Sequence, residues 1–146
     1  MPYTYRVDTD SLALTYYRKS LARRKALNVL FEESSYADTV RESQEICELL
    51  LKGVLRLIGI EPPKFHDVGK IIKENSSALS AEMRPEVDRI ARYSFELRRD
   101  RELAFYGALD VDPWEDYTKT DAEEAMNKVD TILSWSRSFF ERALGS

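Results

Sequence analysis

Residues 38–58, DTVRESQEICELLLKGVLRLI, decide the fold of this chain. Apolar residues recur at helical spacing on almost every side of this segment. Glu48, Lys52 and Arg56 form its one narrow polar strip. A helix with so little polar surface has to be covered on at least two sides, and Gly59 ends it. We therefore predict an all-α fold in which this helix is covered on two sides.

Four more helices are predicted, because helix periodicity recurs along the chain and strand alternation is nearly absent. The expected helices are residues 10–33, 38–58, 68–75, 85–106 and 120–140. The expected caps are Asp10 or Ser11, Asp38, Asp67 and a capping box of Thr120 and Glu123. Residues 76–85 are expected to be a polar connection. The predicted architecture is a single domain, residues 1–146, folded as an antiparallel bundle of four long helices plus one short helix.

The first, fourth and last of the predicted helices are expected to turn the following residues inward. In the first helix these are Leu12, Tyr16, Ser20, Leu27 and Phe31. In the fourth they are Val87, Ile90, Ala91, Ser94 and Phe95. In the last they are Ala122, Ala125, Met126, Val129, Ile132, Leu133, Ser136, Phe139 and Phe140, the most regular amphipathic stripe of the chain.

Composition and charge bound the function. The 146 residues are 43% hydrophobic and 33% charged, as in a soluble globular protein with a charged surface. The formal charge of −4 argues against unspecific wrapping of nucleic acid, which depends on many phosphate contacts. The amino end has no apolar signal region, and the longest apolar run contains Lys52 and Arg56, so we expect a cytoplasmic protein without a membrane span.

The usual ligands of metals and the usual catalytic groups are scarce. The chain has one histidine, His66, and one cysteine, Cys47, which cannot supply the paired ligands of a di-iron bundle or a zinc site. Cys47 stands among apolar residues, and we interpret it as a buried small hydrophobe. The glycines are scattered singly, so no phosphate-binding loop is present. We expect no metal and no cofactor.

Two clusters of basic residues remain as candidate anion sites. The first cluster, on the predicted first helix, contains Arg18, Lys19, Arg23, Arg24 and Lys25. These positions spread over more than half of the helix circumference, so we interpret them as a solvated face. The second is residues 98–106, RRDRELAFY, where Arg98 and Arg99 continue faces that begin with apolar residues. At least one of these arginines is expected to be half-buried, paired either with a nearby carboxylate or with an external phosphate.

Three segments share a pattern with one family of helical domains. They are SYADTVRESQEICELLLKGVLRLIGIEPPKFHDVG (35–69), RRDRELAFYG (98–107) and the amphipathic terminal helix after DYTKTDAEEA (116–125). Together they resemble the HEPN domain, named for higher eukaryotes and prokaryotes nucleotide-binding, over residues 36–140. The resemblance implies a helical bundle, commonly a homodimer, often encoded beside a minimal nucleotidyltransferase as a toxin and antitoxin pair.

The same resemblance implies a link to RNA cleavage, because many members of the family are metal-independent ribonucleases. Their motif is an arginine followed a few residues later by histidine. On this chain Arg99 matches the arginine, Asp100 a frequent polar residue and Tyr106 a trailing aromatic, but the histidine position is Ala104. Alanine cannot exchange a proton, so we assign no catalytic residue.

His66 is the one histidine that could replace the missing group. On paper the end of the fourth helix lies up to about 30 Å from it, at about 1.5 Å per helical residue. Rescue within one chain would need the short helix to turn the chain across the bundle. In the alternative interpretation, His66 orders the loop before Asp67.

We therefore predict a binding and interaction module that forms a homodimer and binds nucleotide or RNA phosphate. The predicted site is Arg98, Arg99, Arg101 and Tyr106, with His66 and Asp67 as secondary residues. A nucleotidyltransferase is the expected partner protein. Two alternatives stay open: a metal-independent ribonuclease that uses His66 supplied across a dimer, and a purely structural adaptor.

Overall fold

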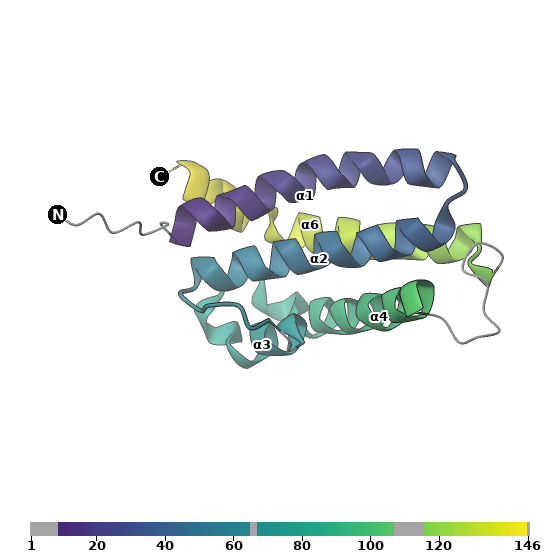
Figure 1. The fold of residues 1–146 in the computed structure, drawn as a ribbon. Coiled ribbons are helices and arrows are strands. Elements are labelled where there is room, and N and C mark those ends of the chain that lie inside the picture. The colour runs from purple at the N-terminus through teal and green to yellow at the C-terminus, as the bar shows by residue number, and fades with distance from the viewer. Residues whose placement is uncertain (1–8, 65–66, 107–115, 146) are drawn as a thin grey trace.

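The computed structural model describes residues 9–64, 67–106 and 116–145, with side chains described for 11–64, 67–101 and 116–145. This part of the chain is an all-α bundle with no strand (Figure 1). The helices are α1 (Thr9–Glu32), α2 (Tyr36–Leu57), α3 (Val68–Glu74), α4 (Val87–Tyr106) and α6 (Lys119–Gly145), with short 3₁₀ turns at Ser76–Ala78 and Arg84–Glu86. The predicted set of four long helices and one short helix is confirmed.

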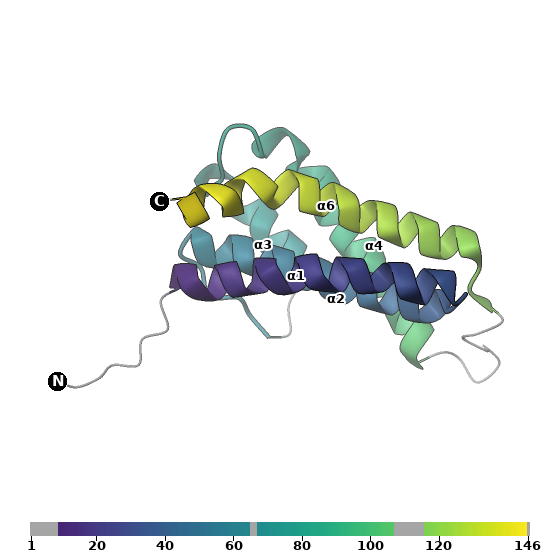
Figure 2. The ribbon, with the colours of Figure 1, turned by 90° about the horizontal axis from the view of Figure 1, so that it is seen from above.

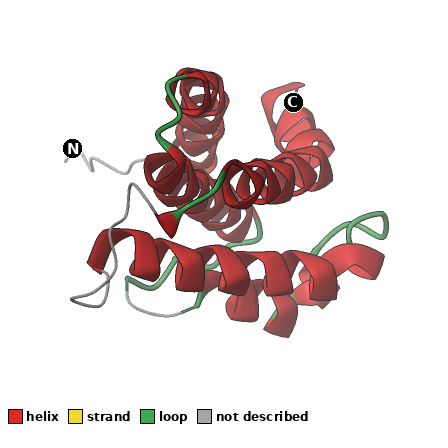
Figure 3. Cartoon of the chain, turned by 90° about the vertical axis from the view of Figure 1, so that its right-hand side faces the viewer, coloured by secondary structure: helices red, strands yellow, loops and turns green. Residues whose placement is uncertain are grey.

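The four long helices alternate in direction along the chain (Figure 1). Helix α2 contacts α1, α4, α6 and α3, and α1 also contacts α6, so α2 lies at the centre and is covered on more sides than the two predicted. Figure 2, seen from above, shows α1 and α6 running side by side along the molecule. Figure 3 shows these helices nearly end-on and α4 from its side, so α4 crosses the others at a steep angle. The short helix α3 packs on α4.

The core is built around α2, whose apolar side chains are covered within one chain. Its buried apolar residues are Val40, Ile46, Cys47, Leu50, Leu51, Val54 and Leu55, each at most 1% exposed. Helices α1, α4 and α6 cover the apolar sides of α2. Helix α2 therefore gives no reason of its own to expect a dimer.

The helix boundaries differ from the predicted ones at their first turns. Helix α1 begins at Thr9, so Asp10 and Ser11 lie inside it. Helix α2 begins after Ser35, whose hydroxyl donates to Asp38 Oδ2 at 2.7 Å, so Asp38 belongs to the first turn and is not the cap. Ser35 and Asp38 can both cap a helix by their side-chain chemistry, and the packing of the chain selects Ser35.

The capping box of α6 lies two residues before the predicted one. Thr118 Oγ1 accepts from the Asp121 backbone N–H at 3.1 Å, and Asp121 Oδ2 accepts from the Thr118 N–H at 2.9 Å. The prediction of Thr120 and Glu123 was therefore wrong, although the motif was of the right type. Thr-x-x-Asp and Thr-x-x-Glu overlap here, and the sequence alone does not separate them.

The predicted polar connection between α3 and α4 also contributes to the core. Leu79 and Met83 are 2% exposed, and the Trp135 indole of α6 donates to the Met83 carbonyl at 3.0 Å. In α1 the buried line is Ala13, Tyr17, Ser20 and Leu27, so the predicted stripe is shifted by one residue at its start. The stripe predicted for α6 is confirmed, with Met126 and Phe139 half-buried at its edges.

Candidate functional site

The arginine cluster that the sequence singled out lies in the second half of α4. Arg98, Arg99 and Arg101 are described with their side chains, whereas for Tyr106, the last residue of α4, the described part is the backbone. His66 lies outside the described residues. The geometry of the candidate site therefore rests on the three arginines and on Asp67.

Arg101 takes part in an ion-pair network that joins three helices. Its Nη2 lies 3.3 Å from Glu45 Oε1 on α2. The same carboxylate lies 3.4 Å from Arg23 Nη1 on α1 and 3.9 Å from Arg41 Nη1. Arg101 is 32% exposed and thus partly withdrawn from solvent. These contacts favour a bundle-closing role for Arg101 and satisfy part of its guanidinium from within the chain.

Arg98 and Arg99 are in a different situation. Arg99 is 57% exposed, and its Nε and Nη2 both donate to Oδ1 of the neighbouring Asp100 at 3.2 Å. An exposed ion pair of this kind is worth about 0–1 kcal/mol, so an external anion can compete with it. Arg98 is half-buried and has no hydrogen bond or ion pair to any of the residues described. At least part of this guanidinium pair is therefore available to a ligand.

A cavity of about 320 Å³ brings these two arginines together with Asp67 and Phe95. Asp67 caps α3, and its Oδ1 accepts from the Gly69 backbone N–H at 3.1 Å. Helix α3 packs against α4, which carries Asp67 to the arginines. The separation of up to about 30 Å concerned His66, which lies outside the described residues, but Asp67, the next residue, lies in the same cavity as Arg98 and Arg99.

Gly69 is what allows the close approach of α3 to α4. A Cβ at this position would lie 3.0 Å from Ser94 Cβ, 3.1 Å from Ala91 Cα and 3.2 Å from the Ala91 carbonyl oxygen. Two of these neighbours are backbone atoms of α4, which cannot move aside cheaply. The absence of a side chain at Gly69 thus fixes the position of Asp67 beside the arginines.

Phe95 was predicted to point inward, and this prediction was wrong. Its side chain is 56% exposed and lines the cavity with Arg98 and Arg99. The buried positions of α4 are Val87, Ile90, Ser94 and Leu97, which alternate steps of three and four. Residue 95 falls beside this line. Leu97 was the residue in the sequence that could have shown this. It continues the spacing of the buried positions, so Phe95 is exposed to solvent.

A second cavity, of about 410 Å³, lies on the other side of Arg99 and is acidic. Its lining residues are Val40, Arg99, Asp100, Asp116, Tyr117, Asp121 and Glu124. The Tyr117 hydroxyl donates to the Asp100 backbone carbonyl at 3.1 Å. Burial and the nearby carboxylates of Asp100, Asp121 and Asp116 raise the pKa of Tyr117 to about 12, so it stays neutral near neutral pH. An anion attracted to Arg99 is therefore repelled from this side and favoured on the Arg98 side.

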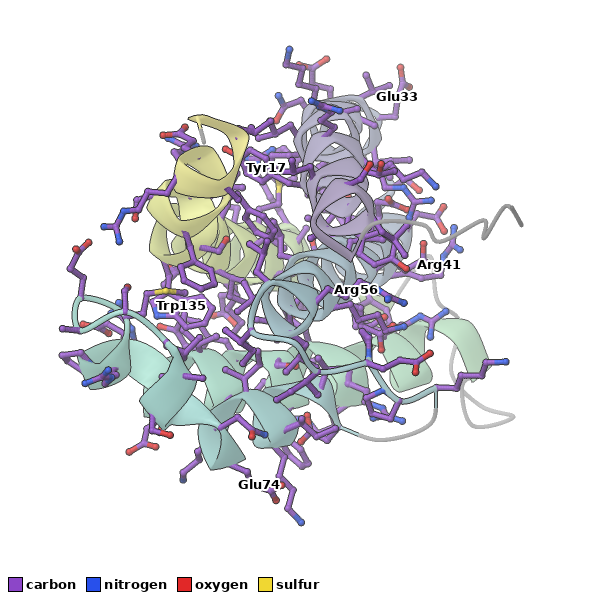
Figure 4. All side chains as sticks on the ribbon, turned by 90° about the vertical axis from the view of Figure 1, so that its left-hand side faces the viewer. Tyr17, Glu33, Arg41, Arg56, Glu74 and Trp135 are labelled. Atoms are coloured by element: carbon purple, nitrogen blue, oxygen red, sulfur yellow. The ribbon has the colours of Figure 1, made fainter. Side chains whose placement is uncertain are left out.

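The largest cavity described, about 690 Å³, lies between the start of α4 and α6 and includes Trp135. Figure 4 shows Trp135 on the opposite side of the bundle from Arg41. Its three carboxylates already have arginine partners: Glu82 with Arg142, Glu86 with Arg89, and Asp130 with Arg24. It contains none of the residues singled out in the sequence. Size alone does not make it the better candidate, because its charges are neutralised within the chain.

Arg23 and Arg24 of the first basic cluster have structural roles in the residues described. Arg24 Nε lies 2.6 Å from Asp130 Oδ1, and Arg23 joins the Glu45 network, so part of the first basic cluster holds helices together. Burial raises the pKa of the Cys47 thiol to about 12, which makes it a poor nucleophile.

No group of three His, Cys, Asp or Glu residues in the described ranges is placed to hold a metal ion. No described helix is both long and apolar enough to cross a membrane.

Comparison with models of known protein families gives a match over most of the chain. A family model described as the HEPN domain matches residues 13–139, which is most of the chain. The match includes α2, α3 and α4 in full, most of α1 and α6, Asp67 and the arginine cluster. No curated protein and no solved structure matches this chain.

Proposed function

Since the chain belongs to the HEPN domain family, we propose that it is a nucleotide- or RNA-binding module whose phosphate contact is made by Arg98 and Arg99. One observation carries this proposal: Arg98 has no partner among the described residues and faces a cavity that it shares with Arg99. A guanidinium holds two phosphate oxygens at once through its planar fork of N–H donors. Two consecutive arginines are therefore better suited to bind an external phosphate than to pair with a carboxylate of the same chain.

Arg98→Ala is expected to weaken binding of a short 5′-phosphorylated single-stranded RNA by about tenfold, since a charge-assisted contact is worth about 1.5–3 kcal/mol. It should also reduce the slope of log K against log salt by about 0.7, the change expected for one phosphate contact to a single strand. Fluorescence anisotropy at several salt concentrations measures both. The melting temperature should stay nearly unchanged, because Arg98 is not paired within the described chain.

Arg89→Ala is the matched control for this experiment. Arg89 lies on the same helix but pairs with Glu86 at 2.9 Å and lines the other cavity. An equal loss of affinity in both variants would mean that unspecific charge drives binding, and it would contradict the site. Absence of RNA and nucleotide binding by the wild-type protein would remove the proposed function and leave the arginines as structural residues.

The wild-type protein is expected not to cleave RNA above background. General acid–base catalysis contributes about 10²–10⁴-fold, and Ala104 stands at the histidine position of the ribonuclease motif. Electrophoresis of labelled single-stranded RNA incubated with protein and a chelator measures the rate. The alternative is a ribonuclease that uses His66. The position of the following residue, Asp67, supports this alternative, because Asp67 lines the cavity that contains Arg98 and Arg99. Cleavage by carefully purified protein that His66→Ala abolishes would establish it.

We also propose, from family membership, that the protein forms a homodimer and acts with a nucleotidyltransferase as a toxin and antitoxin pair in the cytoplasm. Helix α2 is covered within one chain, so the dimer contact would use other surfaces. Sedimentation velocity at micromolar concentration is expected to give a single species of twice the 17.0 kDa chain mass. A monomer at these concentrations would contradict the dimer and would also exclude His66 supplied by a second copy.

A further inference from the structure

We propose that the cavity between α3 and α4 selects guanine: the base stacks on Phe95 and donates hydrogen bonds to Asp67, while Arg98 and Arg99 hold its phosphate. This inference rests on the proposed phosphate contact and adds a base to it. Three different chemistries meet in one cavity of about 320 Å³: an aromatic ring, a carboxylate and two guanidinium groups. Pockets for small molecules begin at about 300 Å³, so the space suits one nucleotide.

Phe95 supplies the stacking surface. The described residues include three large hydrophobic side chains that are exposed, namely Val29, Phe95 and Leu144, and Phe95 is the aromatic one. Exposing most of a phenylalanine ring to water is unfavourable, and the core line of α4 does not require it. A base stacked on such a ring contributes about 1–3 kcal/mol and removes the ring face from solvent.

Asp67 supplies the selectivity, because an ionised carboxylate only accepts hydrogen bonds. Its Oδ1 accepts from the Gly69 N–H, and none of the hydrogen bonds among the described residues uses Oδ2 of this cavity-lining carboxylate. Guanine carries two neighbouring donors on its Watson–Crick edge, the ring N1–H and the N2 amino group. Adenine and cytosine present one amino group there beside an unprotonated ring nitrogen, and uracil presents one N–H between two carbonyl oxygens that a carboxylate repels. A carboxylate therefore matches guanine best.

The charges of the cavity give the nucleotide a direction. Arg98 and Arg99 are consecutive on α4, and Asp67 comes from the loop that begins α3. A phosphate is attracted by the arginines and repelled by Asp67, whereas the donor edge of guanine is attracted by Asp67. The acidic cavity beyond Arg99 disfavours the reverse placement of the phosphate. The base consequently lies between Asp67 and Phe95, and the phosphate lies against Arg98 and Arg99.

Calorimetric titration of the full chain with GMP, AMP, CMP and UMP tests the proposal. GMP is expected to bind at least tenfold more tightly than the other three. Asp67→Asn should remove this preference while keeping the fold, because asparagine also caps a helix and its oxygen can still accept from Gly69 N–H. Phe95→Leu should weaken all four nucleotides by fivefold or more, whereas Val29→Ala, a truncation of another exposed apolar side chain, should change none of them.

The outcomes separate this inference from the proposed function. Binding of all four nucleotides with equal affinity, reduced by Arg98→Ala, would overturn guanine selection and keep the phosphate site. A preference for GMP over dGMP without a preference among the bases would assign Asp67 to the ribose hydroxyls and also overturn it. A GMP preference that survives Asp67→Asn would show that another group reads the base. Absence of binding by all four nucleotides and by RNA would remove both proposals.

Discussion

Phe140→Ala is expected to lower the free energy of unfolding by about 3–5 kcal/mol and to leave nucleotide binding unchanged at temperatures where the variant is folded. Phe140 is fully buried near the end of α6, and its ring stacks on Tyr17 of α1 with centroids 4.7 Å apart. Truncation removes this ring from the contact between α6, α1 and α2 and leaves a cavity. Urea denaturation followed by circular dichroism measures the loss.

Gly53 provides the internal control for that prediction. A Cβ at Gly53 of α2 would lie 2.7 Å from Cζ of Phe140, so the ring occupies the space that a side chain would need. Gly53→Ala is expected to destabilise the wild-type protein, because overpacking costs about 1–3 kcal/mol. In the Phe140→Ala background the same change should stabilise by about 1 kcal/mol, the helix propensity gained when alanine replaces glycine. If Gly53→Ala has the same sign in both backgrounds, Gly53 and Phe140 do not interact as described.

The overall fold was predictable because the strongest signals in the sequence act over long segments. The almost uniformly apolar segment 38–58 predicted a helix covered on two sides, and the stripe from Ala122 to Phe140 predicted the helix that closes the core. Both predictions concern twenty or so residues at once, so an error at one position changes little. Burial of α2 on several sides then follows from its lack of polar surface.

Predictions that concerned single residues were less successful, since several residues competed for one role. Thr118 and Thr120 both precede an acidic residue by three positions, and the structure uses Thr118. Phe95 lies beside the apolar line of α4, and Leu97 takes the buried place. Differences of about 1 kcal/mol separate such alternatives, and tertiary packing outweighs them.

The candidate site was predicted in part. The arginine cluster was identified from its charge and from the resemblance to a known family, and Asp67 was identified as a helix cap beside His66. What the sequence could not supply is their proximity, which depends on the path of the chain between Gly59 and α3. Phe95 was missed as a site residue because an aromatic residue at helical spacing is normally assigned to the core.

A substitution at the contact of α3 with α4 is expected to have the second large effect, because it changes both stability and binding. Gly69→Leu is expected to lower the free energy of unfolding by about 1–3 kcal/mol, toward the upper end, because the new side chain meets the backbone of Ala91. Helix α3 must move away from α4, and Asp67 moves with it. The cavity that contains Arg98 and Arg99 then opens, so affinity for GMP should fall by fivefold or more.

Lys70→Leu is the matched control for Gly69→Leu, since Lys70 is the next residue of the same helix and is exposed. It adds the same side chain without pressing on α4, and neither stability nor affinity should change by much. The comparison with Phe140→Ala completes the design, because that variant loses more stability at a site remote from the arginines. Loss of stability in Gly69→Leu with unchanged affinity for GMP would show that the position of α3 does not matter for binding. The arginines of α4 would then act alone, as a phosphate contact on an open helix surface, and Asp67 would be reduced to its role as a cap.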